Sequence, residues 1–281
     1  MKKIHIPKAQ DKELALSCLV ANEHLLIEDI PGTGKTQLAK DLSKFSKLPS
    51  NRIQCTNDLM PADVLGYYRL TTGNKLKFIE GPVFTNILLI DELNRAPSRT
   101  QSALLEAMEE LQVTIEGKTH KLPDPFFVIA TQNPREQIGI FDLPESQLDR
   151  FSICINMDHK SKEDYLEIMN QTKVTSQQFR KNILTIKKKM KNIHFEDSLK
   201  NYLLNIFENI ENIINKNLAI RPRLQIRRLA EAMASIDNRD FVIPEDILTF
   251  LVPSLRHRLS TNNYEEVHEI VIKALEGVKT P

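Results

Sequence analysis

The chain has 281 residues, enough for one large domain or two ordinary ones, and its 41% apolar and 27% charged residues are typical of a globular protein. The 38 basic and 37 acidic residues nearly cancel, which argues against a dedicated nucleic-acid binder. No apolar run is long enough to cross a bilayer, and the N-terminal residues lack the apolar segment of a secretory signal. With three widely spaced cysteines, interpreted as buried thiols, these features predict a cytoplasmic protein without membrane insertion.

The chain is expected to begin with a helix, a strand and a second helix. Helical periodicity predicts a short amphipathic helix at 8–20 and another at 35–45, and the compact apolar run HLLIED at 24–29 predicts a buried strand between them. A second short strand, RIQC, follows at 52–55. A strand, a glycine-rich loop and a helix in this order form the context in which a phosphate-binding loop is found.

The next part of the chain combines hairpins with buried strands. In chain order we expect a hairpin at 65–84, an apolar strand within 86–97, a helix at 100–111, a hairpin at 112–122, and strands within 125–134 and at 152–157. Strands that alternate with helices predict a parallel sheet wrapped by helices.

The pattern changes beyond Asp158. Residues 161–275 carry helical periodicity and almost no strand signal. We therefore predict two domains with a boundary near 158–161. The first, at 1–158, is an α/β nucleotide-binding core with a parallel sheet between helices, and the second, at 159–281, is all-α.

The segment IEDIPGTGKTQLAK at 27–40 contains a variant phosphate-binding loop. The general pattern is G-x-x-x-x-G-K-[ST], and Asp29 replaces its first glycine. Aspartate tolerates left-handed backbone at modest cost, and both phosphate-facing glycines are present. Lys35 is expected at the β- and γ-phosphates and Thr36 at Mg²⁺. The predicted nucleotide-binding residues are Asp29, Ile30, Pro31, Gly32, Thr33, Gly34, Lys35, Thr36 and Gln37.

Five further polar residues are candidates for chemistry. Asp91 and Glu92 end an apolar strand, where Asp91 is placed to hold Mg²⁺ and Glu92 to orient the attacking water. Asn133 follows another strand, where it can bond the water or the γ-phosphate, or only form a turn. Arg150, which is expected just after a short helix, and Arg223 offer positive forks for a transferring phosphoryl group, with surface ion pairs as the alternative.

These motifs together resemble the MoxR family of AAA+ ATPases over most of the chain. The segments that carry the resemblance are HLLIEDIPGTGKTQLAK, NILLIDELNRAPSRTQSALLEAMEE, FFVIATQNPREQIGIFDLPESQLDRF and DFVIPEDILTFLVPSLRHRL. The resemblance implies an AAA+ P-loop NTPase core with β-hairpin inserts, followed by an all-α lid domain. The hairpins match inserts that this clade shares with magnesium-chelatase-like ATPases.

The resemblance also implies roles that spacing alone does not. The acidic pair would be the Walker B residues, and Asn133 would be sensor 1. Arg150 would be the arginine finger, which reaches the nucleotide of the neighbouring subunit. Arg223 would be sensor 2, acting on the γ-phosphate from the lid of its own subunit, although Arg221 competes for this role.

MoxR-like proteins are chaperone-like ATPases that typically form hexameric rings and activate partner proteins, often ones with a von Willebrand factor A domain. The resemblance therefore implies a homo-oligomeric ATPase that uses ATP and Mg²⁺ and remodels such a client, with no nucleic acid expected. Two alternatives stay open. One is the ATPase motor subunit of a metal-chelatase-type complex, and the other is a nucleotide-gated scaffold with little turnover.

Overall fold

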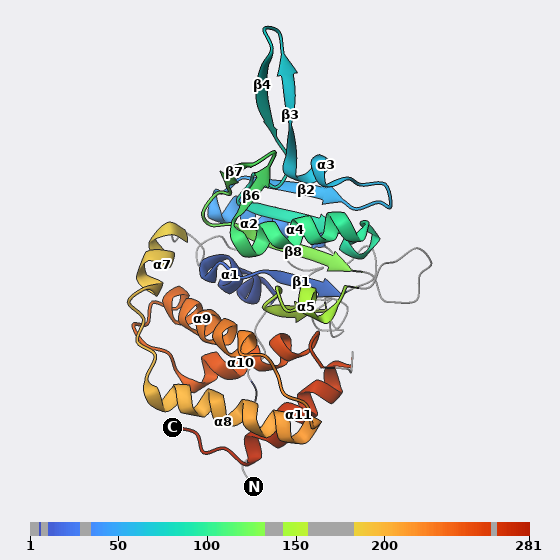
Figure 1. Ribbon diagram of the computed structural model, residues 1–281. Coiled ribbons are helices and arrows are strands. Elements are labelled where there is room, and N and C mark those ends of the chain that lie inside the picture. Colours follow the sequence, from blue (N-terminus) through green and yellow to red (C-terminus); the bar gives the residue numbers. More distant parts are fainter. Residues whose placement is uncertain (1–5, 7–10, 29–34, 133–142, 157–182, 260–262) are drawn as a thin grey trace, which may run out of the picture. The chain divides into compact units, whose positions relative to one another are not determined.

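A computed structural model of the chain describes residues 6, 11–28, 35–132, 143–156, 183–259 and 263–281 (Figure 1). The chain forms two compact units. The sheet-containing unit spans Leu26–Arg150 and resumes at Ile155, and the helical unit combines the chain up to Leu25, Phe151–Cys154 and the helices from 183 onward. The boundary predicted near 158–161 lies outside the described residues.

Five strands form the central parallel sheet, in the order β2-β5-β8-β1-β9. Their bounds are Ser50–Gln54 for β2, Ile87–Asp91 for β5, Phe127–Gln132 for β8, Leu25–Glu28 for β1 and Ile153–Ile155 for β9. Every residue of β5 is buried, as are the first five of β8. Burial on both faces is typical of parallel sheets and explains the continuous apolar runs in the sequence. Helices α2 (Lys35–Ser46) and α4 (Ser98–Glu110) lie on opposite faces of this sheet (Figure 1).

Two antiparallel hairpins are inserted into the sheet-containing unit, as predicted. One pairs β3 (Gly66–Thr71) with β4 (Lys75–Glu80), and the other pairs β6 (Gln112–Ile115) with β7 (Lys118–Lys121). The β3–β4 hairpin extends beyond the sheet (Figure 1). The turn between β6 and β7 has positive φ at two successive residues, which matches the twist of the strands.

The base of the β3–β4 hairpin depends on glycine. Gly66 has φ of 99°, and a Cβ atom there would lie 2.3 Å from the carbonyl oxygen of Ile79. Short helix α3 (Pro61–Leu65) leads into this glycine and was not predicted, because five residues are too few to show helical periodicity. The close approach of the two strands therefore excludes any side chain at Gly66.

The helical unit contains five helices after residue 182 among the described residues, in agreement with the helical periodicity of the sequence. These are α7 (Ile183–Met190), α8 (Asp197–Ile214), α9 (Arg221–Ile236), α10 (Pro244–Leu255) and α11 (Tyr264–Glu276). Helix α9 packs against α10, and α8 packs against α11. None of the described helices combines the length and the apolarity needed to cross a membrane.

Helix α1 (Asp11–Ala21) differs from its prediction. It belongs to the helical unit, where it packs against α9 and α7. Eight successive residues, Leu14–Ala21, are buried, so the helix is enclosed rather than amphipathic. Cys18 lies in this buried run, and all three cysteines are buried thiols outside any disulfide bond, as predicted.

Candidate active site

The flanks of the phosphate-binding loop have the predicted arrangement. Strand β1 ends at Glu28 and helix α2 begins at Lys35. A helix that begins directly after such a loop directs its N-terminal amides and its positive dipole end toward a bound phosphate. Gln132, at the end of β8, donates a hydrogen bond to the carboxylate of Glu28 and so joins two neighbouring strands beside the loop.

Several of the predicted site residues lie outside the part of the chain that the structure describes. These are Asn133 and the loop residues Asp29, Ile30, Pro31, Gly32, Thr33 and Gly34. For Lys35 and Thr36 the structure describes the helical backbone but not the side chains. Gln37 is exposed and donates a hydrogen bond to Asp41 at 2.6 Å, one turn along the same helix.

Asp91 is the last residue of β5 and is held by a cation. Its Oδ2 atom accepts a hydrogen bond from Nε of Arg52 at 2.6 Å, and the Asp91 side chain is only 10% exposed. The neighbouring thiol of Cys55 has its pKa raised to about 12 by burial and by the charges of Asp91 and Glu92. A carboxylate oxygen is the ligand type that Mg²⁺ prefers, and the Arg52 side chain that pairs with it is 54% exposed. The Asp91 carboxylate therefore has the chemistry of a Mg²⁺ ligand.

Glu92 adopts a left-handed backbone conformation, with φ of 56° and ψ of 50°. This conformation costs a non-glycine residue about 1–2 kcal/mol and needs support from its surroundings. Its N–H donates to Oγ1 of Thr131 at 2.9 Å, and its Oε2 accepts from Nε2 of Gln54 at 2.9 Å. Arg95 lies 3.3 Å from the same carboxylate oxygen. The left-handed backbone and the contacts with these three neighbours fix the direction of the Glu92 carboxylate.

Thr131 and Gln54 are functional candidates that sequence reasoning missed. Thr131 is 1% exposed, so its hydroxyl group is the partner of Glu92 in place of water. A signal was present, since Thr131 interrupts the apolar run of β8 with a hydroxyl just before the strand ends. Gln54 carried no comparable signal, because only the parallel pairing of β2 with β5 brings it beside Asp91 and Glu92.

Arg150 follows helix α5 (Glu145–Leu148), the short helix expected before it. Its Nη1 donates to the carbonyl oxygen of Leu105, and its Nη2 lies 3.0 Å from Oε2 of Glu109. Both partners belong to α4 of the same chain. The Arg150 side chain is 25% exposed, and its buried Nε has no hydrogen-bond partner among the described residues. In this structure Arg150 is thus docked on its own chain.

Arg223 joins α8 to α9 within the helical unit. Its Nη2 lies 2.9 Å from Glu211, its Nη1 donates to the carbonyls of Leu218 and Ala219, and its guanidinium lies 4.5 Å from the ring centroid of Phe207. Burial tends to raise the pKa of Glu211, but hydrogen bonds from Arg223 and from the backbone N–H of Leu218 lower it overall. These contacts define a structural role for Arg223. The choice between it and Arg221 as sensor 2 stays a prediction.

Two family models match this chain, one over most of the sheet-containing unit and one over part of the helical unit. The model of the ATPase family associated with various cellular activities matches residues 24–153, and the AAA lid domain matches residues 214–273. Chaperone MoxR1 of Mycobacterium tuberculosis is 34% identical over 92% of this chain and 73% of its own length. YeaC of Bacillus subtilis is 36% identical over 100% of this chain and 92% of its own length. The crystal structure of a candidate ATPase from Cytophaga hutchinsonii matches with a TM-score of 0.81 at 33% identity, covering 96% of this chain and 89% of that one.

A parallel sheet with hairpin inserts, an acidic pair at the end of β5 and a helical lid together define an ATPase of the AAA class. ATP binding follows from this class. The chain belongs to the MoxR family of these ATPases. The predicted family and the predicted fold class are therefore confirmed.

Proposed function

We propose that this ATPase acts as a hexameric ring in the cytoplasm and uses ATP hydrolysis, with Mg²⁺, to remodel a partner protein that carries a von Willebrand factor A domain. Its membership of the MoxR family and its similarity to a protein named chaperone MoxR1 support this proposal. Bound Mg²⁺ would neutralise phosphate charge during the transfer. Thr36 and Asp91 would hold it, as their hydroxyl and carboxylate oxygens suit this cation.

The remaining site residues would act on the water and the phosphates. Glu92, fixed in its left-handed turn, would orient the attacking water. Lys35 would neutralise the β- and γ-phosphates, and Asn133 would bond the water or the γ-phosphate. Arg150 would leave its contacts on α4 and complete the site of the neighbouring subunit. An arginine finger supplied by a second protein raises the hydrolysis rate about 10³–10⁵-fold in GTPases.

One observation carries the remodelling proposal: successive elements of the chain and side-chain contacts connect Glu92 with the projecting hairpin. Glu92 leads through a short 3₁₀ helix (Leu93–Arg95) into α4, and α4 leads directly into the β6–β7 hairpin. On β7, His120 shares a hydrogen bond of 2.9 Å with the hydroxyl of Tyr68 and stacks on Phe78, with ring centroids 3.9 Å apart. Because Tyr68 and Phe78 belong to β3 and β4, these contacts would carry a shift at Glu92 to the projecting hairpin.

The distal half of the β3–β4 hairpin has the character of a contact surface for a client. Leu70 and Leu76 pair across the strands and are 61% and 55% exposed. They continue the apolar face whose proximal half, at Tyr68 and Phe78, is covered by His120, and by Phe84 next to it.

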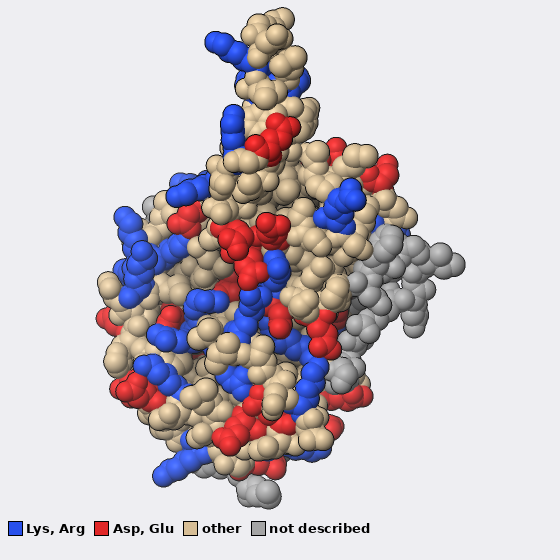
Figure 2. All heavy atoms as spheres, viewed as in Figure 1, with Lys and Arg blue, Asp and Glu red and all other residues tan. Residues whose placement is uncertain are grey.

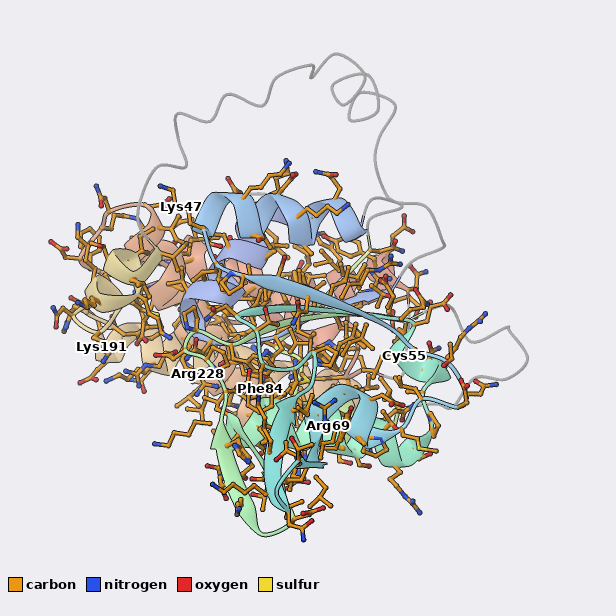
Figure 3. All side chains as sticks on the ribbon, turned by 90° about the horizontal axis from the view of Figure 1, so that it is seen from above. Lys47, Cys55, Arg69, Phe84, Lys191 and Arg228 are labelled. Carbon is orange, nitrogen blue, oxygen red and sulfur yellow. The ribbon has the colours of Figure 1, made fainter. Side chains whose placement is uncertain are left out.

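The opposite face of the hairpin carries positive charge. Arg69, Lys75 and Lys77 alternate with the leucines along the two strands, and Figure 2 shows Lys and Arg side chains along this projection. Arg69 on the hairpin and Phe84 at its base are both labelled in Figure 3. No acidic residue lies between Arg69 and Lys77. The client segment that fits this surface is acidic with apolar side chains.

The nucleotide chemistry is tested by two substitutions. Lys35→Ala should abolish tight ATP binding, so normal affinity in a titration would contradict the loop assignment. Arg150→Ala should retain ATP binding and lose turnover, and mixing it with Glu92→Gln subunits should partly restore turnover. Full turnover by Arg150→Ala alone would remove the finger role.

The client is tested with Glu92→Gln as an ATP-state trap. A pull-down with this variant should enrich a von Willebrand factor A protein, and adding Leu70→Ser and Leu76→Ser should abolish the enrichment. Leu204→Ser is the matched control, because Leu204 is 48% exposed on α8 of the helical unit. Capture of a large chelatase subunit would favour the metal-chelatase alternative, and absence of phosphate release at every protein concentration would favour a scaffold.

A further inference from the structure

The segment LRHRL at 255–259, at the end of α10, places three ionisable side chains in the interior of the helical unit. Arg256, His257 and Arg258 are 6%, 7% and 8% exposed. Burying such groups is costly unless hydrogen bonds replace the lost water. The contacts of these residues therefore indicate what the segment does, which the hydrolysis mechanism above does not explain.

Arg258 and His257 both bind the backbone carbonyl of Phe151, and Arg258 also binds that of Ser152. Nη2 of Arg258 donates to the carbonyl oxygen of Phe151 at 2.9 Å and to Gln225 at 2.7 Å, and Nη1 donates to the carbonyl oxygen of Ser152 at 3.3 Å. Nε2 of His257 lies 3.0 Å from the carbonyl oxygen of Phe151. The carbonyl of Phe151 thus accepts hydrogen bonds from two side chains of the segment that follows α10.

The protonation state of His257 follows from this geometry. A carbonyl oxygen only accepts, so Nε2 must carry the proton. Nδ1 is buried and has no hydrogen-bond partner among the described residues, which leaves a neutral ring. Burial lowers the pKa of His257 well below its ordinary value, and the positive charges of Arg258 and Arg256 lower it further, while the bond to Phe151 opposes them.

Ser152 is held by further groups of the same unit. Its N–H donates to the carbonyl oxygen of His24 at 2.9 Å, and its hydroxyl donates to the carboxylate of Glu23. That carboxylate also accepts from Arg228 of α9, which is labelled in Figure 3. Both Phe151 and Ser152 are fully buried. The backbone at these two positions is consequently constrained by several hydrogen bonds inside a packed region.

The constrained pair follows Arg150 directly in the sequence. Between Arg150 and Phe151 the chain passes from the sheet-containing unit to the helical unit. Successive Cα atoms are about 3.8 Å apart, so a displacement of Phe151 moves the backbone of Arg150 with it.

We propose that Arg258 and His257 are positioning residues for Arg150. By holding the carbonyls of Phe151 and Ser152, they attach the backbone of the finger to the lid, so a movement of one subunit's lid re-aims the finger that serves its neighbour. This inference rests on the proposed role of Arg150 and adds residues that set its position. It predicts that substitution of Arg258 or His257 lowers ATP hydrolysis in the active site of the neighbouring subunit.

The test uses mixed assemblies of the full-length chain. His257→Leu removes the N–H donor, and Arg258→Lys removes the planar fork while it keeps the charge. Each should lower kcat about 10–10²-fold with the ATP dissociation constant changed less than about twofold, because misplacement of a catalytic group by about 1 Å costs up to 10² in rate. Adding excess Glu92→Gln subunits, whose fingers are intact, should partly restore turnover, as is expected for Arg150→Ala.

Two controls make the outcome decisive. His257→Gln retains an N–H donor and should keep at least about half of the normal kcat, as rescue by a conservative change. Thermal melting checks folding, and Arg258→Lys carries the test where His257→Leu does not fold. Failure of Glu92→Gln subunits to restore turnover would locate the defect in the variant's own site and overturn the inference, as would normal kcat in both variants. If Arg150→Ala itself retains full turnover, the proposed finger role of Arg150 is wrong, whatever the result for Arg258 and His257.

Discussion

The hydroxyl of Thr131 should be required for hydrolysis although it touches no predicted phosphate ligand. It accepts the backbone N–H of Glu92 at 2.9 Å and is 1% exposed, so no water can take its place. Thr131→Val preserves the shape of the side chain and removes the acceptor of this hydrogen bond, at a cost of about 1–3 kcal/mol. The melting temperature should fall by about 2–4 °C for each kcal/mol.

The effect of Thr131→Val on turnover should exceed its effect on stability. Glu92 occupies a left-handed conformation that costs about 1–2 kcal/mol, so loss of the supporting bond favours relaxation of the backbone. Its carboxylate then leaves the position set by Gln54 and Arg95. We expect kcat to fall about 10²-fold with an unchanged ATP dissociation constant, measured by steady-state phosphate release and by ATP titration.

Thr131→Ser distinguishes the contribution of the hydroxyl group from that of the methyl group of this side chain. Serine keeps the acceptor and loses only packing, so kcat should stay within about threefold of normal while the melting temperature falls slightly. Equal loss of kcat in the serine and valine variants would refute the reasoning, because the bond to Glu92 would then not be the cause. Normal kcat in Thr131→Val would refute it as well.

The structure supports three further predictions. Gly66→Ala should lower the melting temperature by several degrees, because its Cβ would lie 2.3 Å from the carbonyl oxygen of Ile79, whereas Gly73→Ala, with no atom within 4 Å, should cost less. Folding stability should decrease as pH falls below about 6.5, because unfolded His257 gains a proton there that the folded ring excludes, and His257→Gln should remove this contribution in urea unfolding at pH 7 and pH 5. Cys55, with its pKa near 12, should react with a thiol reagent at pH 8 only after unfolding, and fast labelling of Cys55 in the native protein, mapped by mass spectrometry, would contradict its burial.

Local sequence patterns sufficed for most of the core. Uninterrupted apolar runs predicted β5 and β8, because strands buried on both faces exclude polar side chains. Alternation around turn residues predicted both hairpins, and Arg150 follows the short helix expected before it. Each of these features is encoded within about ten successive residues, so neighbours in sequence are enough to specify it.

Tertiary structure decided the features that depend on residues far apart in the chain. The burial of α1 on all sides comes from its packing against α9 and α7, which no periodicity of its own residues reveals. Arg150 is docked on Glu109 of α4, and Arg223 stacks on Phe207 of α8, so each contact joins segments that are separate in the sequence.

The sequence by itself determined the chemistry that is present: a phosphate-binding loop, an acidic pair at the end of a buried strand, and arginines in a core and a helical lid. Only the tertiary structure decided how those groups are held. The left-handed turn of Glu92 depends on a hydroxyl 39 residues away, and the backbone after Arg150 depends on Arg258, more than 100 residues away. Hydrogen bonds of this kind form only when the packed core removes water and brings distant segments together, so their partners leave no periodic trace in the sequence.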